Sequence, residues 1–359
     1  MNKKNNQKRL LMQNLKKQLI PVLAVLLALL IGMIILLIAK RNPIEAYIAL
    51  FKGSFGDLSR FGDTLQRSTP IIFTGLAVAF AFRCGLFNIG VEGQLLIGAL
   101  VSAYVGYYVK GLPMIVHLPL TIISGMIAAG IWAAIPAILK AYRGVHEVIT
   151  TIMLNYIAIS LLAYSIETLR NSPIPKTPDI LDSAKLAKLG EFLPFFKDSS
   201  VNIGFVLAIV TCFLVYFILW KTVLGYEVRA VGYSPLAAED GGIKISKNII
   251  YAMIISGMLA GLGGVEGVLG LKHSLVSGLY DGYGFEGIAV ALLANNNPIG
   301  IIISGILLGS LSSGGLYMDM AANVPQDIIK IIQALIIFFV VANQIVRFIV
   351  YGKKKEVLL

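Results

Sequence analysis

Three hydrogen-bonding side chains lie close together beyond Arg83 in a largely apolar stretch of the sequence between Phe80 and Gln94. They are Asn88, Glu92 and Gln94, and they stand in the run FRCGLFNIGVEGQ. If this stretch lies at membrane depth, each polar group needs a partner, because an unsatisfied polar group there costs several kcal/mol. Amide and carboxylate groups on an apolar wall can bind a neutral polar molecule through hydrogen bonds.

The sequence leaves two interpretations of Glu92 open. Its carboxylate can contact a bound molecule, or it can cap a helix that begins near Gly93, where the positive end of the helix dipole favours a negative charge. Glu286 stands in the same kind of position, so the same two interpretations apply to it. Glu266 lies inside an apolar stretch between glycines, and we expect it to hydrogen-bond a neighbouring helix, with contact to a bound molecule as the alternative.

The tetrapeptide around Glu92 recurs along the chain. Gly90–Gly93 reads GVEG and Gly284–Gly287 reads GFEG, while a further GVEG lies at Gly264–Gly267. The first two copies occupy corresponding places in the two halves, because each opens an apolar segment that follows a Gly-rich one. This placement indicates duplication, and in proteins with internal repeats of this kind the binding site lies where interrupted helices meet.

Signatures of catalysis are missing from the sequence. It contains no G-x4-G-K-[ST] phosphate loop and no G-x-S-x-G nucleophile turn, so we expect no ATP hydrolysis and no enzyme activity from this chain. Histidines, cysteines and carboxylates do not cluster at metal-ligand spacing, and Cys84 and Cys212 stand in or beside apolar stretches. We therefore expect no metal and no cofactor bound by the chain itself.

The composition is that of a membrane protein. The chain has 359 residues, of which 57% are hydrophobic and 14% charged, and its mean hydropathy is +0.82. Soluble proteins carry roughly 25% charged residues, and about 20 apolar residues cross a bilayer core of roughly 30 Å. The expected fold class is an all-α polytopic membrane protein of about ten spans. The predicted spans are 20–39, 68–82, 93–109, 115–139, 147–165, 201–220, 248–271, 284–294, 299–317 and 325–350, of which 68–82 and 284–294 are notably short or interrupted by glycine.

The positive-inside rule orients these spans. An even number of spans places a basic N-terminal segment, 1–19, and a C-terminal tail, 351–359, in the cytoplasm on either side of a transmembrane domain, 20–350. The basic residues at the two ends also contribute much of the net charge of +11, which therefore needs no nucleic acid to explain it. Residues 40–67 depart from the rule, because they should lie outside yet carry several basic side chains.

Two connections are unusually long, an external loop at 166–200 and a cytoplasmic loop at 221–247. The cytoplasmic loop contains Thr222–Ile243, a small-residue helical segment between two strongly apolar stretches. Its residues follow the spacing T-x2-G-x4-A-x-G-x4-A-A-x3-G-I. A turn between spans needs only a few residues, so this length favours an ordered helical segment. The alternative is an ordinary cytosolic loop rich in alanine and glycine.

Three blocks of the sequence resemble the permeases of ABC importers in the branch that carries simple sugars, branched-chain amino acids and nucleosides. The blocks are F-R-x-G-L-F-N-I-G-x-E-G-Q at 82–94, GVHEVITTIMLNY at 144–156, and the small-residue spacing at 222–243. The resemblance runs from about residue 68 to about residue 340, and it is closest to nucleoside permeases of the purine or guanosine type. It implies a permease fold built from two pseudo-repeated halves.

The resemblance also implies partners. Two permease chains, often different proteins in nucleoside systems, would face each other around one pathway in a bacterial cell membrane. Each would bind one of two ATP-binding cassette ATPase subunits, which use the ATP, while an extracellular substrate-binding protein or lipoprotein delivers the cargo. Small residues of the loop would allow the ATPase to approach closely. The implied coupling residues are Gly225, Glu227, Arg229, Ala230, Gly232, Ala237, Ala238 and Gly242.

The implied substrate pathway comes from the polar and aromatic residues of the interrupted segments. Aromatic rings could stack on a nucleobase, while amide and carboxylate groups could bind ribose hydroxyls and base edges. The residues are Phe82, Phe87, Asn88, Glu92, Gln94, Glu286 and Asn295. Asn295 also belongs to the run Asn295–Pro298, which predicts a turn between two spans. Arg83, at the end of a span, is expected either to pair with a glutamate or to extend to the membrane surface.

Two alternatives remain at this stage. A permease for a simple sugar such as ribose or galactose has the same architecture. A secondary transporter driven by an ion gradient would use membrane carboxylates, and Glu92, Glu266 and Glu286 are candidates for that role.

Overall fold

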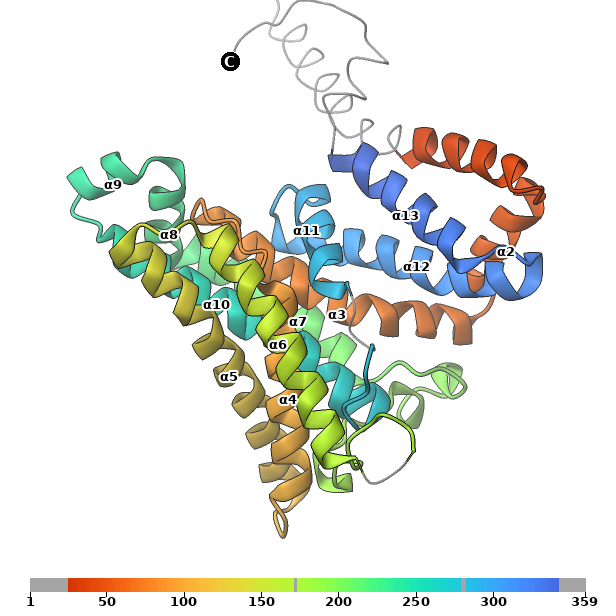
Figure 1. Cartoon of the computed structure of the whole chain (residues 1–359), viewed down its shortest axis with the longest axis horizontal. Helices are drawn as coiled ribbons and strands as arrows, with labels where there is room; N and C mark the ends of the chain where they lie inside the picture. The colour runs from red at the N-terminus through yellow and green to blue at the C-terminus, as the bar shows by residue number, and fades with distance from the viewer. Residues whose placement is uncertain (1–24, 171–172, 279–281, 342–359) are drawn as a thin grey trace, which may run out of the picture. The chain divides into compact units, whose positions relative to one another are not determined.

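The computed structural model describes residues 25–170, 173–278 and 282–341 (Figure 1). Within these ranges the chain is helical, and its extended pairing is limited to two isolated bridges, Lys176–Val276 and Lys188–Asn202. Six of the described helices are long and apolar enough to cross a membrane. The predicted terminal segments, 1–19 and 351–359, lie outside the described residues, as do parts of the first and last predicted spans.

The described chain divides into two compact units, 1–53 with 314–359 and 54–313. In the first unit, an apolar helix over Val25–Ile38 packs with α2 (Pro43–Phe55), the last turns of α12 (Pro298–Ala322) and α13 (Gln326–Val341). The Tyr47 hydroxyl donates a hydrogen bond of 2.5 Å to the carbonyl oxygen of Leu29.

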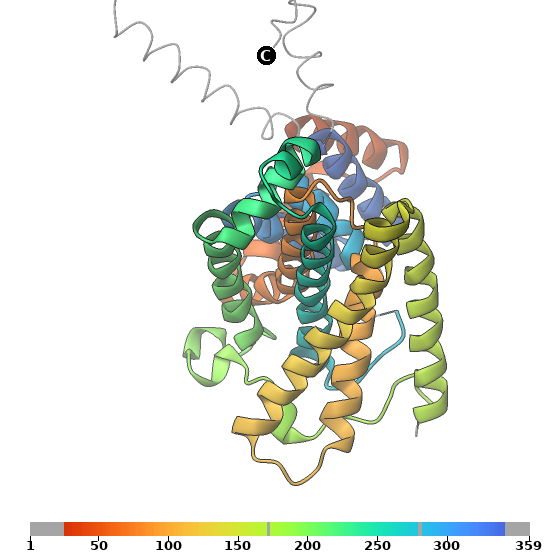
Figure 2. The same ribbon diagram turned by 90° about the vertical axis from the view of Figure 1, so that its left-hand side faces the viewer.

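The second unit is organised around α10 (Ile245–Glu266), which continues without a break into a π-helical turn, η4 (Gly267–Lys272). α10 packs against α3 (Leu58–Arg83), α4 (Val91–Tyr108) and α5 (Met114–Arg143), as Figures 1 and 2 show. Glycine permits these close crossings, because a Cβ on Gly98 would lie 2.6 Å from the backbone of Gly261. Small residues at helix crossings are typical of membrane proteins, where van der Waals packing drives helix association.

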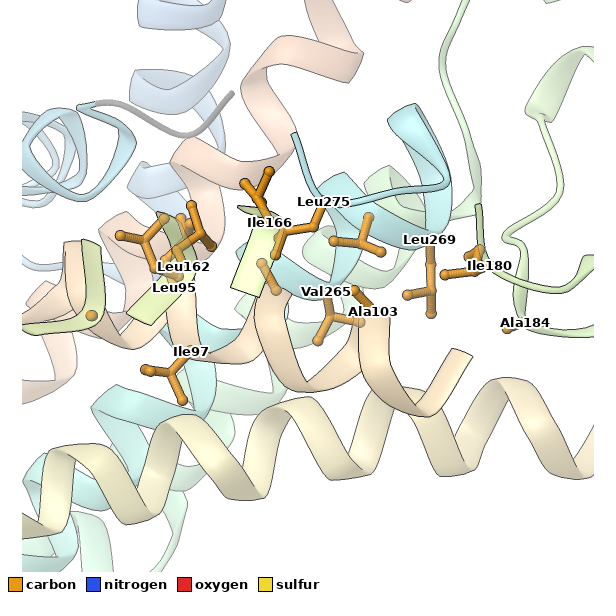
Figure 3. Packing of buried hydrophobic residues seen from close by; sticks show 14 of the residues in the cluster. Leu95, Ile97, Ala103, Leu162, Ile166, Ile180, Ala184, Val265, Leu269 and Leu275 are labelled. Carbon is orange, nitrogen blue, oxygen red and sulfur yellow. The ribbon is translucent and has the colours of Figure 1, made fainter. Parts of the chain in front are cut away.

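Apolar side chains from four parts of the second unit form its core (Figure 3). Leu95 on α4, Ile166 on α6 (Glu147–Leu169), Leu269 on η4 and Leu275 just beyond it are all nearly or fully buried. Residues far apart in the sequence therefore hold α4, α6 and the end of α10 together.

The second unit has two ends, which Figure 2 separates clearly. The first, called here the α8–α9 end, carries α8 (Val223–Tyr233) and α9 (Pro235–Asp240), which follow α7 (Ile203–Lys221). The turn between α5 and α6 lies at the same end, since the Ser246 hydroxyl donates to the Ala141 carbonyl at 3.4 Å. The second, called the loop end, carries the α4–α5 turn and residues 173–202. That segment contains three short 3₁₀ turns, Asp182–Ala184, Leu189–Glu191 and Pro194–Phe196.

A short helix, α11 (Tyr283–Leu293), lies beside α3, and the turn after it leads into α12. The predicted turn at Asn295–Pro298 is confirmed. Asn295 and Asn296 adopt left-handed backbone angles, with φ of 51° and 55°, and α12 begins at Pro298. Asparagine tolerates this conformation better than most residues.

The structure corrects two predicted boundaries in the first part of the chain. The span predicted at 68–82 is not short, because α3 begins ten residues earlier at Leu58 and has 26 residues. Hydropathy misses its first turns because they carry the charged residues Arg60 and Asp63. In the structure Arg60 pairs with Asp57 at 3.1 Å, and Asp63 accepts from the Ser200 hydroxyl at 2.6 Å. The stretch 40–67 is also not a plain connection, since it contains α2.

Candidate functional site

The segment 84–90 returns from the end of α3 to the start of α4 and carries its polar side chains inward. Asn88 is 1% exposed, and its amide nitrogen donates to Gln94 Oε1 at 2.9 Å and to Ser256 Oγ at 2.8 Å. Gln94 Nε2 donates back to Asn88 Oδ1 at 3.1 Å. Ser256 in turn donates to the Ala77 carbonyl of α3 at 2.6 Å. A closed polar network thus joins α3, α4 and α10 in an apolar surrounding.

A second side chain holds the start of α4 against α6. Asn155 accepts from the backbone N–H of Gly93 at 2.9 Å and donates to the Ile89 carbonyl at 3.0 Å. One carboxamide therefore satisfies an unpaired N–H at the helix start and a carbonyl in the segment before it. Asn155 belongs to the sequence block at 144–156, but no role was predicted for it, because the sequence around it does not indicate that its side chain reaches another helix.

Glu92 also makes its contacts across helices. Its carboxylate accepts hydrogen bonds from the backbone N–H of Gly282 at 2.9 Å and of Gly284 at 2.6 Å, at the N-terminus of α11. Glu92 stands in the first turn of α4, as the capping interpretation requires, but these two hydrogen bonds of its carboxylate cap a second helix, α11. A negative group is favoured there because unpaired N–H groups and the dipole are both positive.

Close packing reinforces this junction. A Cβ on Gly284 would contact the backbone nitrogen and Cα of Glu92, and a Cβ on Gly287 would lie 2.6 Å from Thr74 Oγ1. The Thr74 hydroxyl also donates to the Tyr283 carbonyl at 2.9 Å. The N-termini of α4 and α11, which carry the two copies of the tetrapeptide, therefore meet beside α3.

The structure brings together most of the predicted pathway residues, but not all of them. Asn88, Glu92 and Gln94 gather at the start of α4, and Glu286 lies on the first turn of α11, where its Oε2 has no hydrogen-bond partner among the described residues. Phe82 and Phe87 contact each other, with ring centroids 5.1 Å apart. Asn295 is separate, in the turn beyond the far end of α11.

A polar cluster that sequence reasoning did not assemble lies nearer the loop end. Glu266 Oε1 accepts from Gln66 Nε2 of α3 at 2.7 Å and from Asn202 Nδ2 at 2.8 Å. This confirms the expectation that Glu266 hydrogen-bonds a neighbouring helix. Asn202 also donates to Gln66 Oε1 at 2.9 Å and caps α7 by accepting from the Gly204 N–H at 2.7 Å. All three side chains are buried.

The predicted coupling loop forms two short helices at the α8–α9 end. Thr222 caps α8 by accepting from the Gly225 N–H at 3.2 Å, and Ser234 caps α9 by accepting from the Ala237 N–H at 3.4 Å. Hydroxyl side chains at these positions satisfy N–H groups that a helix start leaves unpaired. The expectation of helical structure in Thr222–Ile243 is therefore confirmed.

The glycines of this loop serve the chain itself. A Cβ on Gly225 would contact the carbonyl of Ile218 in α7, and one on Gly232 would contact the carbonyl of Arg83 at the end of α3. Their small size allows α8 to lie against α7 and α3, so the close approach expected of these two glycines occurs within this chain. Gly242 differs, since its φ of +82° is a left-handed conformation that favours glycine.

The exposed residues of α8 and α9 include large apolar and aromatic side chains beside the two acidic residues that end α9. Tyr226, Tyr233 and Leu236 are exposed, Tyr233 by 81% and Leu236 by 76%. Ala237 is exposed beside them, whereas Ala238 is only 5% exposed and points into the protein. These three large side chains were not among the coupling residues expected from the sequence, because the motif at 222–243 is defined mainly by small residues.

Arg83 links the end of α7 to the turn after α11. Its guanidinium donates to the carbonyls of Asn296 at 2.9 Å and Asn295 at 3.2 Å, and it lies 5.1 Å from the centroid of the Trp220 ring. Arg229 of α8 lies 5.8 Å from the same ring. Among the described residues Arg83 forms no ion pair with a glutamate, since its guanidinium binds backbone carbonyls and an indole face. Its extension to the membrane surface stays a prediction. Glu227 accepts from Asn248 Nδ2 at 3.0 Å and so ties α8 to α10.

Charged pairs order the segment at the loop end. Lys176 donates to Asp179 at 2.8 Å and Lys185 to Asp182 at 2.6 Å. The hydrogen bond from Lys176 holds the pKa of Asp179 below its usual value. Among the described residues, no group of three or more His, Cys, Asp or Glu side chains is arranged to hold a metal ion.

Comparison with known proteins places this geometry in a family. The family model for the permease component of branched-chain amino acid transport systems matches residues 61–341. The chain is 41% identical over 348 residues to the guanosine ABC transporter permease protein NupP of Bacillus subtilis (strain 168), covering 96% of this chain and 99% of that protein.

Two further relatives cover most of the chain. It is 38% identical over 340 residues to the nucleoside ABC transporter permease protein NupB of Lactococcus lactis (92% of this chain, 93% of that protein). It is 34% identical over 339 residues to the glucose ABC transporter permease protein TsgB13 of Haloferax volcanii (90% and 87%). No solved structure matches. The matched residues include both the α4–α11 junction and the α8–α9 end, and this multi-pass membrane protein belongs to the family of branched-chain amino acid transport system permease components.

Proposed function

We propose that this chain is a permease subunit of an ABC importer for nucleosides. The observation that carries the proposal is its similarity, along nearly the whole of both chains, to a guanosine permease. The similarity to a nucleoside permease from a second organism agrees with it. In this role the chain forms part of the pathway and carries out no chemical step, so ATP is bound and hydrolysed by a separate subunit and no cofactor is bound here.

The α8–α9 end is the proposed contact with the ATPase. Its exposed side chains Tyr226, Tyr233 and Leu236 form the kind of apolar anchor that protein interfaces use. Gly225, Gly232, Glu227 and Ala238 hold the two helices on the permease instead. Of the coupling residues expected from the sequence, Ala237 is therefore the one best placed to touch the ATPase directly.

Motion at this contact has a route into the membrane part of the chain. Arg83 contacts the Trp220 ring, which Arg229 of α8 also faces, and it binds the carbonyls after α11. A shift of α8 that displaced these groups would act on α11, whose other end is bound by Glu92. A partner can drive such a shift only by binding the two arrangements with different affinity.

The membrane arrangement follows from the same assignment. We propose a transmembrane domain over 20–350 in a bacterial cell membrane, with about ten spans and both chain termini in the cytoplasm. The loop 221–247 and the α8–α9 end then face the cytoplasm, and residues 166–200 at the loop end face outward. The meeting of α4 and α11 through GVEG and GFEG supports two pseudo-repeated halves, with the pathway passing near their junction.

A second permease chain completes the proposed importer. Bacillus subtilis has another relative, the guanosine ABC transporter permease protein NupQ, which is 30% identical to this chain over 278 residues. Two related permeases named for one cargo in one organism support a pair of different chains here. Two ATPase subunits, and an extracellular binding protein that meets the loop end, complete the assembly.

A hydroxylated sugar is the second candidate cargo, because one relative is named as a glucose permease. Guanosine and glucose both contain a hydroxylated ring, so a pathway that binds such rings fits either. Coupling to an ion gradient is the third, less favoured candidate.

Reconstitution of the chain with its partner permease, ATPase subunits and binding protein tests these alternatives. Uptake of labelled guanosine or inosine into proteoliposomes should require ATP inside and should persist when ion gradients are collapsed. Uptake of labelled glucose that nucleosides do not inhibit would favour the sugar alternative. Uptake by the permease alone, driven by an imposed ion gradient, would refute the proposal.

A further inference from the structure

A polar cavity of about 160 Å³ lies beside Glu266, at the end of the second unit that carries residues 173–202. It is bordered by helices α3 and α10, by the π-helical turn η4, by Ser200 and by Tyr283, the first residue of α11. Its lining residues include Gln66, Arg67, Ser200, Glu266, Lys272 and Tyr283. A buried water needs roughly 10–15 Å³, so the cavity has room for about ten waters. It could equally hold a group the size of a ribosyl ring, which has about nine non-hydrogen atoms.

Glu266 has unused hydrogen-bonding capacity at this cavity. The side chain is 2% exposed, and both described hydrogen bonds to it end on Oε1. Oε2 is buried and has no partner among the described residues. An unpaired buried polar atom is unfavourable, so a hydroxyl donor that reached Oε2 from the cavity would stabilise the site.

Three groups organise this carboxylate as part of a built site. Gln66 and Asn202 fix its position from two other helices, and Gly270 lies against the Asn202 amide, where a Cβ would collide with it. The π-helical turn begins directly after Glu266, at Gly267. Short π-helical turns inside α-helices are frequently found at functional sites.

The charges around the cavity select the class of ligand. A carboxylate on its buried side disfavours an anion, while Arg67 and exposed Lys272 disfavour a bare cation. The ring of Tyr283 adds an apolar wall. This combination fits a neutral molecule that presents hydroxyl groups to Glu266 and an apolar face to Tyr283.

We infer that this cavity is a binding subsite for the vicinal hydroxyl groups of a nucleoside's ribose, with Glu266 as the acceptor. The inference rests on the proposed function. Access runs from the loop end, where Lys272 is exposed, so the subsite would receive the cargo before it reaches the α4–α11 junction. None of the pathway residues expected from the sequence lines it.

Chemical protection tests the subsite without changing Glu266. In the reconstituted permease–ATPase complex, Leu271→Cys places a thiol on the cavity wall, whereas the native Cys84 and Cys212 are buried. We expect inosine to slow labelling of this thiol by a small hydrophilic methanethiosulfonate reagent at least fivefold, and 2′,3′-dideoxyinosine to have no effect. The matched control is Leu193→Cys, an exposed position on the same end, whose labelling should not respond to either compound.

Transport kinetics provide the second readout. Glu266→Gln keeps an oxygen for Gln66 and Asn202 but replaces the unpaired oxygen with a donor. We expect the KM for inosine to rise about tenfold, because a hydrogen bond to a charged group is lost, and the KM for 2′,3′-dideoxyinosine to stay within about twofold.

The outcomes separate the two proposals. Equal protection by inosine and its dideoxy analogue, no protection by either, or equal KM changes for both would overturn the subsite while ATP-driven inosine uptake left the proposed function intact. Absence of inosine uptake by the wild-type complex would instead refute the proposed function.

Discussion

The carboxylate of Glu92 binds the backbone N–H of Gly284 at 2.6 Å, and these two residues begin different helices. Each belongs to a copy of the same tetrapeptide pattern, GVEG at 90–93 and GFEG at 284–287. The contact therefore joins the starts of α4 and α11 directly to each other. Because α11 is also held by Arg83 at its far end, its position depends on both α4 and the α8–α9 end.

Removing the Glu92 charge should weaken this junction. Glu92→Gln can accept only one of the two N–H groups well, so we expect a loss of about 1–3 kcal/mol of stability and a fall of about 5 °C in the unfolding temperature of the purified protein in detergent. Nucleoside uptake should fall as well.

Glu286→Gln is the matched control for Glu92, since Glu286 lies on the first turn of α11 and its Oε2 has no described partner. Its unfolding temperature should match that of the wild type. If the two variants lower the unfolding temperature equally, the junction does not depend on Glu92.

Two neighbouring glycines of α10 should respond differently to alanine. In Gly264→Ala the new Cβ would collide with the Leu95 carbonyl and lie 2.8 Å from the Ala99 nitrogen, both in α4. Overpacking of this kind costs about 1–3 kcal/mol, so thermal unfolding should occur at lower temperature. Gly263→Ala meets nothing closer than 3.3 Å, and we expect little change, because alanine also favours the helix. A reversed order would contradict the packing described for α4 and α10.

A charge on the exposed face of α9 should prevent binding of the ATPase without unfolding the permease. Ala237→Glu is expected to abolish uptake and co-purification of the ATPase at an unchanged unfolding temperature. Ala238→Glu buries its charge instead, so it should lower the unfolding temperature. Normal uptake by Ala237→Glu would argue strongly against docking at this face.

The link through Arg83 should affect coupling more than folding. Arg83→Lys keeps the charge but cannot reach both carbonyls after α11 and loses the planar contact with Trp220. We expect nucleoside transported per ATP hydrolysed to fall about tenfold, a loss of about 1.4 kcal/mol in coupling.

Arg229→Lys tests whether any arginine near Trp220 has this effect. It faces the same ring but bonds only within α8, through Nε to the Gly225 carbonyl at 3.3 Å. We expect a smaller change in the ratio of transport to hydrolysis. A parallel loss of both activities in Arg83→Lys would point to misfolding and not to coupling.

The sequence by itself determined the membrane class, most of the helical segments, the turn at Asn295–Pro298 and the helical character of the coupling loop. These features depend on local properties: the length of an apolar run, the backbone preferences of asparagine and proline, and the caps at Thr222 and Ser234. Where local chemistry was ambiguous, as in the first turns of α3, the hydropathy pattern placed the boundary ten residues late.

Only the tertiary structure decided which polar groups satisfy one another. The partners are far apart in the sequence: Asn155 binds Gly93, Glu92 binds Gly284, and Glu266 binds Gln66 and Asn202. Many pairings of buried polar groups are compatible with the same composition. Helix packing selects one pairing, because each buried group must find a partner within about 3 Å. The same packing decides which residues of the loop at 221–247 face outward, so that Ala237 is exposed whereas Ala238 is buried.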